Sequence, residues 1–308
     1  MQINKFCTNN KANNLGIIIL NYNAGNLSIK AAMNILQFDL NIKVIIVDNC
    51  STDNSREILE KNKGIKNLYI IYNKVNSGYA AGNNYGAKWI CENLPTIDTL
   101  CIMNPDVVIS DANTLVTLYE KINEHKYIGA LTTEVIMNGN YSDKRNPCAW
   151  KFFTEWTMLL EGGIIGRLIC RDLYYESLHC YDDNIALVDV VQGCLFVIKK
   201  ETFCEIKGFD ENTFLYYEEM ILAKRLEKIG KKCGVCLDLF INHNHKVEKL
   251  QTRKLQAKYF EMRCYLESRI YYLENYMNTS QLYKIVTKKI LQTDYYIKKA
   301  ILKLILNK

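Results

Sequence analysis

Several signals that would define a broad class of protein are missing from this 308-residue sequence. Charged residues interrupt the longest apolar runs well before the roughly 18 residues that a membrane-spanning helix needs. The first residues, MQINKFCTNNKANN, are polar and contain no apolar core of a secretory leader. We therefore expect a protein that is neither secreted through such a leader nor inserted across a membrane.

Two common nucleotide-binding motifs are also missing. A dinucleotide fingerprint needs three glycines in the first strand-to-helix turn, but the turn from Asn21 to Asn26 contains only Gly25. No phosphate loop ending in Gly-Lys-Ser/Thr occurs anywhere in the chain. These absences argue against a nicotinamide-dependent oxidoreductase and against a phosphate-loop protein.

A net positive charge is missing outside the last fifth of the chain. The net charge is +6, but residues 246–308 contain 14 Lys/Arg and 5 Asp/Glu, a balance of +9, which leaves 25 against 28, or −3, for residues 1–245. A surface made for nucleic acid is therefore not expected. A basic terminal element that contacts anionic lipid is favoured instead.

Hydrophobic residues make up 49% of the sequence, which is enough to bury one large core or two modest ones. The 12 cysteines are scattered singly through apolar stretches, for example at Cys101, Cys194 and Cys204. This scatter indicates packing roles in a reducing compartment rather than a disulfide framework.

Strand and helix patterns alternate through the first 110 residues. Continuous apolar runs, typical of strands buried on both faces of a parallel sheet, cover 15–20, 43–47, 68–72 and 100–103. Helical patterns follow the first three runs, over about 26–37, about 54–61 and up to about residue 93. This order predicts the parallel, nucleotide-binding half of an α/β domain.

Polar side chains follow these strands at the points where they end. The last strand stops at Asn104-Pro105-Asp106, because proline has no N–H to donate to a sheet ladder. The carboxyl ends of strands form the ligand crevice of an open α/β sheet, so Asp106 is expected to meet a hard cation or a sugar hydroxyl. The structural alternative is an Asx turn. The clustered amides and carboxylates suit a base, a ribose and a divalent ion on a diphosphate, so a nucleotide sugar fits them better than NAD.

Seven short motifs occur in order along residues 15–250. They are Ile19–Asn23, Val47–Asp53, Asn76–Asn84, Asn104–Asp106, Val191–Phe196, Lys207–Glu211 and Phe214–Glu219. Together they resemble the donor-side and acceptor-side motifs of glycosyltransferase family 2, the inverting GT-A enzymes, and particularly its rhamnosyltransferase-like branch. The resemblance implies an α/β GT-A fold with a mostly parallel central sheet flanked by helices.

The resemblance also implies roles for individual residues. Contacts to the nucleotide sugar are expected from the polar and glycine residues near the strand ends, namely Asn21, Asn23, Asp48, Asn49, Ser51, Asn76, Gly78, Asn83, Asn104 and Asp106. Asp106 corresponds to the remaining acid of an Asp-x-Asp metal motif whose first position is Asn104, so Mg²⁺ or Mn²⁺ is the expected cofactor. Gly193, Asp210 and Glu211 are assigned to the acceptor or the sugar.

Adjacent acids, Glu218 and Glu219, open a helix predicted over about 220–229. A helix dipole favours acids at the N-terminus whatever the function, which is the structural alternative. By the resemblance, Glu219 takes the place of the general base and Glu218 is the second catalytic candidate. The final acid of the family's motif is replaced by Ile221.

An apolar run over 186–198 predicts one strand, in which Gly193 marks either close approach of a ligand or an ordinary bulge. Between about residues 141 and 189 no motif is readable. Trp150, Trp156 and several tyrosines there are candidates for the wall of a sugar acceptor cleft, although such aromatic residues more often pack a core.

A strand predicted over 233–241 delivers His243 and His245 to the crevice edge. The family has a histidine at the end of such a strand, so either residue is a candidate ligand of the metal or of the diphosphate. Solvated loop histidines are the alternative. A zinc site with Cys233 and Cys236 is disfavoured, because the separations are shorter than those of structural zinc modules.

From residue 250 onward the pattern is helical. One helix opens around residues 259–270, and a second, over 281–308, alternates isoleucine and leucine with lysine, as at Ile290, Ile297 and Leu304. Such a helix either docks on its own domain or lies in a membrane interface. The charge excess here, and the polyprenyl-linked acceptors that the family implies, favour the membrane.

The predicted organisation is a polar tail (1–14), a glycosyltransferase domain (15–249) and a basic helical extension (250–308). The domain divides into a nucleotide-binding half (15–110) and an acceptor half (111–249). We expect a hexosyltransferase at the cytoplasmic face of the cell membrane that moves a sugar, with inversion, from dTDP-rhamnose or a UDP-sugar to a glycan or polyprenyl-linked glycan of a cell-surface polysaccharide. Because two family acids are replaced, a catalytically silent nucleotide-sugar or glycan-binding protein is the alternative. The sequence leaves homo-oligomers open.

Overall fold

A computed structural model describes residues 12, 14–137, 148–160, 173, 175, 177–244 and 255–306. Most of the predicted N-terminal tail, and His245, lie outside these residues. The strands are β1 (Leu15–Asn21), β2 (Lys43–Asp48), β3 (Leu68–Tyr72), β4 (Thr99–Met103), β5 (Val107–Val108), β6 (Ile128–Met137), β7 (Ala149–Trp150), β8 (Ile185–Val188), β9 (Val190–Val191), β10 (Leu195–Lys199) and β11 (Lys232–His243). The helices are α1 (Gly25–Leu36), α2 (Ser55–Glu60), α3 (Tyr79–Asn93), α4 (Ala112–Glu124), α5 (Glu155–Leu160), α7 (Lys200–Glu205), α8 (Glu218–Lys228), α9 (Leu255–Tyr276) and α10 (Gln281–Leu306).

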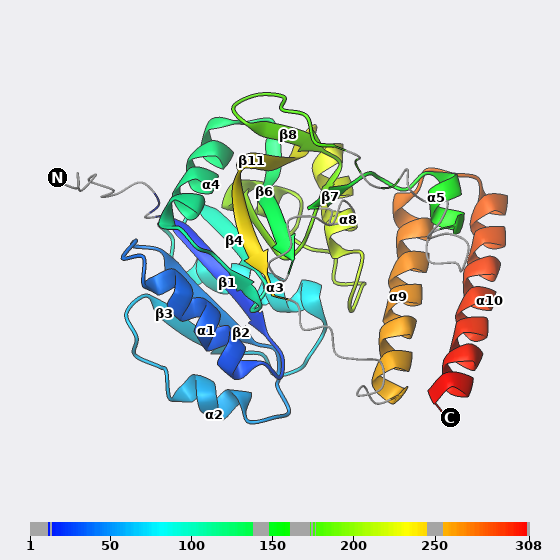
Figure 1. Cartoon of the computed structure of the whole chain (residues 1–308), viewed down its shortest axis with the longest axis horizontal. Helices are drawn as coiled ribbons and strands as arrows, with labels where there is room; N and C mark the ends of the chain where they lie inside the picture. The colour runs from blue at the N-terminus through cyan, green and yellow to red at the C-terminus, as the bar shows by residue number, and fades with distance from the viewer. Residues whose placement is uncertain are drawn as a thin grey trace.

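One large mixed sheet forms the centre of the molecule (Figure 1). Its strand order is β3-β2-β1-β4-β10-β6-β11-β5, with β8 also paired to β11. The first four strands are mutually parallel, and β6 and β11 pair in parallel with each other. In the described chain, β7 and β9 form a separate two-stranded sheet.

The apolar runs of the first half form the buried strands that their composition predicts. Ile18 belongs to one hydrophobic cluster and its neighbours Ile17 and Ile19 to another, so β1 is covered on both faces. A strand buried on both faces can place polar side chains only at its ends. Asn21 and Asp48 accordingly lie opposite each other at the carboxyl ends of β1 and β2.

The prediction of one strand over 186–198 is wrong, because that stretch forms β8, β9 and β10 in succession. Polar groups inside the run bond outside the large sheet. The carboxylate of Asp189 accepts a hydrogen bond from the Phe152 N–H at 3.1 Å, and the Gln192 N–H donates to the Cys148 carbonyl at 2.8 Å. The chain then turns at Gly193 and re-enters the sheet as β10, which runs antiparallel to β4.

The C-terminal helices α9 and α10 stand side by side next to the sheet domain (Figure 1). Tyr272 and Leu273 of α9 are fully buried and belong to the same core cluster as residues of the sheet. The hydroxyl of Ser268 donates to the Leu215 carbonyl at 2.8 Å. The boundary at residue 250 stays a prediction, and α9 shares the core of the main domain.

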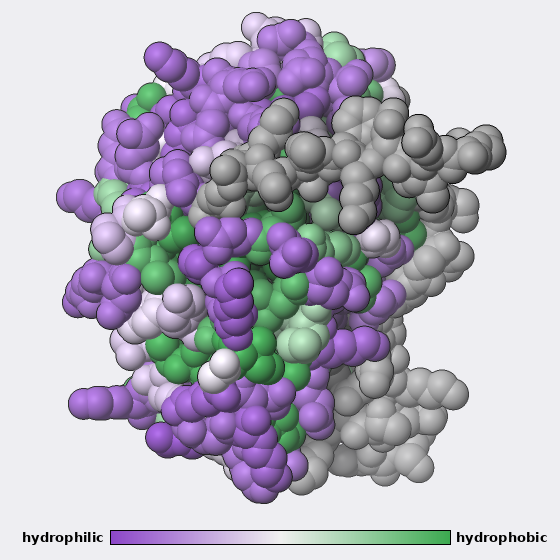
Figure 2. Space-filling model, turned by 90° about the vertical axis from the view of Figure 1, so that its left-hand side faces the viewer, coloured by the Kyte–Doolittle hydropathy of each residue, from purple (hydrophilic) through white to green (hydrophobic). Residues whose placement is uncertain are grey.

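Figure 2 shows the molecule from the left-hand side of Figure 1. Hydrophobic side chains gather in a band across the middle of this face, with hydrophilic surface above and below it. Exposed apolar side chains of α1 include Leu27 and Met33, which are 40% and 44% exposed. Exposed apolar surface is therefore not confined to the C-terminal helices.

Asp210 fastens α9 to the main domain. Its carboxylate accepts hydrogen bonds from the hydroxyls of Tyr271 and Tyr276 at 2.9 and 2.5 Å, and from Asn212. Arg225 Nη2 lies 2.8 Å from the same carboxylate, which is 4% exposed. Burial alone raises the pKa of Asp210, but the hydrogen bonds from Tyr276, Asn212 and Tyr271 outweigh burial and lower it to about 2.

We expect Asp210→Asn to lower the free energy of unfolding at pH 7 by about 3 kcal/mol, because Arg225 loses a buried anionic partner. The folded-state pKa, about 2, lies below the ordinary value of 3.8. The stabilisation is therefore present above about pH 4 and is lost as the pH falls towards 2. Thermal unfolding from pH 7 to 3 measures both effects. Glu211→Gln, at the exposed neighbour, is the matched control, and equal stability of the two variants would contradict the assignment.

Candidate functional site

The carboxyl ends of β1 and β2 share a buried polar network. The Asn21 side-chain amide donates to Asp48 Oδ1 at 2.7 Å, and the Ser51 hydroxyl donates to the same oxygen at 2.5 Å. The Ser28 hydroxyl donates to Asn21 Oδ1 at 2.9 Å. Asn21 and Asp48 are buried and bonded to neighbouring loops. The hydrogen bonds of these two residues fix the loop that follows β2.

A second network joins the loop after β2 to the loop after β3. The Asn49 side-chain amide donates to Asn76 Oδ1 at 2.9 Å and to the Gly78 carbonyl at 3.1 Å, and Asn73 donates to Asn49 Oδ1 at 2.9 Å. Gly78 has a φ of +96°, and a Cβ there would lie 2.2 Å from the Phe214 carbonyl oxygen. Only glycine fits this position, where the start of α3 meets the segment before α8.

The other residues predicted to contact the nucleotide sugar lie next to these networks. Asn23, exposed and in the left-handed region at φ 55°, accepts a hydrogen bond from the Thr52 N–H at 2.8 Å. Ser51 and Asn76 are partly exposed. Asn83 is buried within α3 and donates to the Tyr79 carbonyl at 3.0 Å. The nucleotide contacts assigned to all these residues stay predictions.

Asp106 and His243 meet at the same edge of the sheet, although 137 positions separate them in the sequence. Antiparallel pairing of β5 with β11 sets His243 opposite Val107, and the Asn244 N–H donates to the Asp106 carbonyl at 3.0 Å. His243 Nε2 lies 3.1 Å from Asp106 Oδ1. The sheet register therefore holds a carboxylate and an imidazole together at the end of β4 and β11.

This pair fits a divalent cation that also binds a diphosphate. Mg²⁺ is usually held by one or two carboxylates together with substrate phosphate oxygens, and Mn²⁺ accepts the same oxygen ligands. Asp106 supplies the carboxylate. His243, which is 7% exposed, supplies a ring nitrogen, and the pairing of β5 with β11 holds that nitrogen next to the Asp106 carboxylate. The ligand role of both residues is a prediction that this geometry supports.

A second group of potential ligands lies elsewhere on the surface. Within the described residues, ligand atoms of Glu124, His125 and Asp183 lie within 4.8 Å of one another. Asp183 already bonds to His125 at 3.2 Å and pairs with the Lys121 ammonium at 3.3 Å. Because Lys121 supplies the positive charge that this acid needs, the cluster is explained as an ion-pair network.

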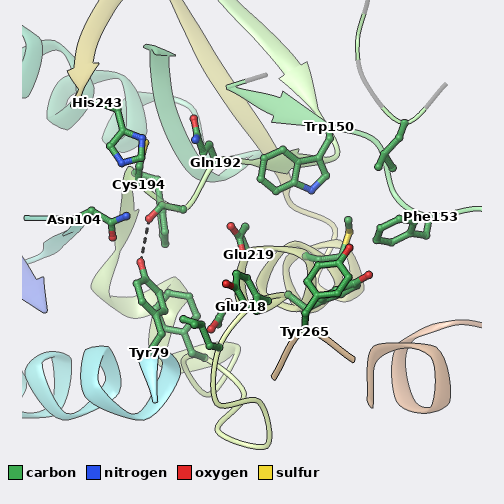
Figure 3. Close-up of a pocket in the computed structure, with 18 residues that line it drawn as sticks. Tyr79, Asn104, Trp150, Phe153, Gln192, Cys194, Glu218, Glu219, His243 and Tyr265 are labelled. Carbon is green, nitrogen blue, oxygen red and sulfur yellow. Dashed lines mark hydrogen bonds between the residues drawn. The ribbon is translucent and has the colours of Figure 1, made fainter. Parts of the chain in front are cut away.

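A cavity of about 400 Å³ opens beside Asn104 and His243 (Figure 3). Its aromatic walls come from Tyr79, Trp150, Phe153, Phe196, Phe209, Tyr216, Tyr217 and Tyr265. Its polar lining residues are Asn104, Gln192, Glu218, Glu219 and His243. A mostly apolar cavity with a few convergent polar groups is the usual form of a small-ligand site.

Glu219 lines this cavity (Figure 3), and its carboxylate lies next to the turn at Gly193. A Cβ on Gly193 would lie 3.1 Å from Glu219 Oε1, so the glycine makes room for the carboxylate. Burial raises the pKa of Glu219, and hydrogen bonds from the main chain of Glu219 and Gly193 partly oppose that rise. These hydrogen bonds favour the charged form of Glu219.

Glu218 is more deeply buried, with 6% of its surface exposed. Burial, and then the charge of Glu219, raises the pKa of Glu218 to about 8. Among the described residues, its Oε1 atom has no hydrogen-bond partner. Burial and the neighbouring charge thus favour the protonated form of Glu218, whereas the main-chain hydrogen bonds favour the charged form of Glu219.

The segment before α8 is strained and is held by aromatic packing. Tyr216 and Tyr217 have φ angles of 75° and 71°, which non-glycine residues rarely adopt. The Tyr217 ring lies 5.7 Å from the rings of both Phe153 and Tyr265 and 5.6 Å from that of Tyr272. Helix α9 thus helps to fix the direction of the two glutamates, which the sequence does not reveal.

Several other predictions acquire a structural context. Asp210 lies outside the cavity lining and bonds to α9, and exposed Glu211 accepts a hydrogen bond from Asn84 at 2.8 Å. Their acceptor roles stay predictions without a cavity contact. Cys233 and Cys236 belong to clusters on opposite faces of the sheet, so they do not converge on a zinc ion. Trp150 lines the cavity, whereas Trp156 is 73% exposed.

The model of the family described as Glycosyl transferase family 2 matches residues 16–186. The chain belongs to this family. Among curated relatives, it is 22% identical over 221 residues to the low-salt glycan biosynthesis hexosyltransferase Agl10 of Haloferax volcanii, covering 71% of this chain and 64% of the relative. It is 22% identical over 225 residues to the rhamnosyltransferase WbbL of Escherichia coli K12, covering 70% and 77%. The chain thus spans less than two thirds of the archaeal relative's length.

The fold is shared with solved glycosyltransferases. The mannosyltransferase PcManGT of Pyrobaculum calidifontis, in complex with GDP-Man and Mn²⁺, has a TM-score of 0.57 at 14% identity, covering 92% of this chain and 69% of that one. Residues 1–349 of S. aureus TarS, in complex with UDP-GlcNAc, have a TM-score of 0.52 at 15% identity, covering 92% and 72%. These similarities confirm the GT-A fold predicted for this family 2 chain.

We expect Asp106→Asn to abolish Mn²⁺ binding in the presence of a nucleoside diphosphate, because the amide removes the anionic oxygen ligand while keeping the size of the side chain. Electron paramagnetic resonance of free Mn²⁺ during titration measures the affinity directly, without turnover. Asp111→Asn is the matched control, since Asp111 is exposed and caps α4, a role that asparagine also fills. An Asp106→Asn variant that binds Mn²⁺ like the unmodified protein would exclude Asp106 as a ligand.

Proposed function

We propose that this protein is an inverting glycosyltransferase that moves a sugar from a nucleoside diphosphate to a hydroxyl of a glycan or lipid-linked glycan. The observation that carries the proposal is that His243, which contacts Asp106, lines the same cavity as Glu219 and Gly193. The end of the cavity at His243 suits a diphosphate bound to a metal ion, and the end at Glu219 suits a catalytic base. A UDP-sugar or dTDP-rhamnose is the donor class that we favour.

The proposed reaction is a single displacement at the anomeric carbon. The acceptor oxygen forms the new bond to that carbon while the bond to the diphosphate oxygen breaks, and the electron pair leaves with the diphosphate. Glu219 takes the acceptor proton. Because the acceptor attacks the face opposite the leaving group, the anomeric configuration inverts.

A divalent cation held by Asp106 and His243 would neutralise charge on the departing diphosphate. The protein residues position the other participants. The aromatic walls of the cavity exclude water from the acceptor, and the raised pKa of Glu219 makes it a stronger base than an exposed glutamate.

A catalytically silent binding protein on the same fold is the second candidate, because Asn104 and Ile221 stand where the family motifs have acids. Two glutamates with raised pKa values in one cavity favour the enzyme, since such groups concentrate at catalytic sites. Release of nucleoside diphosphate from a panel of nucleotide sugars, with Mg²⁺ or Mn²⁺ and glycan acceptors, separates the two. Binding without turnover of any donor would support the silent protein.

We expect Glu219→Gln to lower sugar transfer by about 10² to 10⁴ with near-normal donor affinity, because the amide cannot accept the acceptor proton. Glu218→Gln should lower transfer less than about tenfold, since glutamine resembles the protonated form that burial favours at Glu218. Transfer rates and donor binding are compared side by side. The reverse order of damage would identify Glu218 as the base.

Helix α10 packs against the rest of the protein on one side and exposes an apolar face on the other. Thr287 and Leu291 of α10 are buried, and α10 packs against α9 and α5. The exposed apolar residues of α10 are Leu282, Ile285, Val286, Ile290, Tyr296, Ile297, Ile301 and Leu304. Lysines, including Lys289, Lys299 and Lys303, accompany this face along the helix. No described helix is long and apolar enough to cross a membrane.

We infer that this face of α10 lies on an anionic membrane surface, at the cytoplasmic side where nucleotide sugars are available. Apolar side chains enter the interface, and the adjacent lysines pair with acidic lipid headgroups. Such a location would bring the cavity to acceptors that are themselves attached to lipid. The name of the Haloferax volcanii relative places that protein in glycan biosynthesis but does not specify the acceptor of this chain.

Replacing Leu282, Ile297 and Leu304 by glutamine should lower partitioning onto phosphatidylserine-containing vesicles at least about tenfold, because three exposed apolar side chains no longer enter the interface. Vesicle sedimentation at moderate salt measures the effect. Val75→Gln combined with Met33→Gln is the control, since both residues are exposed and lie outside α10. Unchanged partitioning of the α10 variant would show that α10 is only a packing helix.

A further inference from the structure

The turn at Gln192–Cys194 is held by a hydrogen bond at each residue. The Gln192 N–H donates to the Cys148 carbonyl at 2.8 Å, and the Asn104 N–H donates to the Cys194 carbonyl at 2.8 Å. Between them, Gly193 lies against the Glu219 carboxylate, since a Cβ there would be 3.1 Å from Glu219 Oε1, and a hydrogen bond from its main chain partly opposes the rise in the pKa of that group. Because glycine is the least restricted residue, the direction of this central hydrogen bond depends on what holds the Gly193 carbonyl.

Tyr79, the first residue of α3, supplies that contact. Its hydroxyl donates to the Gly193 carbonyl at 3.0 Å (Figure 3). Its own N–H donates to the Phe214 carbonyl at 2.9 Å, four residues before Glu218. Tyr79 therefore bridges the two segments that face Glu219, namely the turn after β9 and the segment that leads into α8.

We propose that Tyr79 is a positioning residue for Glu219, acting through the Gly193 carbonyl that its hydroxyl holds. The inference rests on the proposed function, in which Glu219 is the base. No motif of the sequence assigns this role. The positioning role depends on the hydroxyl group alone. The Tyr79 ring packs edge-on against Phe209 at 5.8 Å, and it would do so without the oxygen.

The surroundings keep the Tyr79 hydroxyl protonated, so that it can donate a hydrogen bond. Burial, and then the charges of Glu219 and Glu218, raises the pKa of Tyr79 well above its ordinary value, so the hydroxyl does not ionise at working pH. The titratable groups that face Glu219 are Glu218 on α8, Tyr79 on α3 and Cys194 in the turn, and His243 of β11 lines the same cavity. Of these, Tyr79 bonds the Gly193 carbonyl.

Tyr79→Phe removes the hydroxyl and leaves the ring. We expect kcat for sugar transfer to fall about tenfold, because small misplacements of a catalytic group cost one to two orders of magnitude. The KM for the donor should stay within about twofold, since the donor networks at β1 and β2 do not use this hydroxyl. A weaker Gly193 hydrogen bond stabilises the Glu219 anion less, so the acid limb of the pH profile should move to higher pH.

Tyr85→Phe is the matched control. Tyr85 lies on the same helix, and its exposed hydroxyl bonds a main-chain carbonyl, that of Tyr72, at 3.4 Å. It should leave kcat and the pH profile unchanged. Gly193→Ala, whose Cβ would press on Glu219, should reproduce the kcat loss by displacing the same carboxylate from the other side. A Tyr79→Phe enzyme with unchanged kcat and pH profile would overturn the proposal, as would a change confined to thermal stability.

A titration of Glu219 tests the positioning role of Tyr79 independently of the proposed sugar transfer. Carbon-13 NMR of labelled glutamate carboxyls, with Glu219→Gln used to identify the resonance, reports the Glu219 pKa without turnover. We expect that pKa to rise in Tyr79→Phe and to stay constant in Tyr85→Phe. If the unmodified protein transfers no sugar but the pKa moves, the proposed function fails and the positioning contact stands. If transfer occurs and the pKa is constant, the positioning role fails alone.

Discussion

The burial of the central strands on both faces is the constraint on which this protein depends. Strands β1, β2 and β4 present apolar side chains to both layers of the molecule, so their polar residues are confined to the strand ends. Because the three strands are parallel, those ends lie at one edge of the sheet. Asn21 and Asp48 are brought together by this geometry, Asn104 follows β4 at the same edge, and the loops after β2 and β3 are bonded to each other.

The reversed strand β10 completes the candidate site from the second half of the domain. Its first residue, Leu195, pairs with Met103, the last residue of β4, so the turn that precedes β10 lies at the edge where the parallel strands end. Gly193 thereby comes between Asn104 and Glu219. A parallel strand in this position would have placed that turn at the opposite edge, away from the metal ligands that we propose.

The C-terminal helices support the site as well as extending the surface. Helix α9 packs Tyr265 and Tyr272 against the strained residue Tyr217, and Asp210 bonds α9 to the main domain. Strain of this kind persists only where surrounding contacts determine the conformation. The exposed apolar face of α10 is therefore attached, through α9, to the segment that directs Glu218 and Glu219.

The sequence by itself determined the parallel first half and the start of α8 at two adjacent acids, because hydrophobic periodicity and chain breaks are local properties. The GT-A fold followed from the resemblance of the ordered motifs to those of glycosyltransferase family 2. Tertiary structure alone decided that His243 meets Asp106, that the run over 186–198 is split, and that Tyr79 holds Gly193. The first and third features depend on sheet register and on hydrogen bonds between residues more than 100 positions apart, and the second on hydrogen bonds of Asp189 and Gln192 to another segment. No local pattern encodes which strand lies beside which, so these contacts appear only when the whole chain is folded.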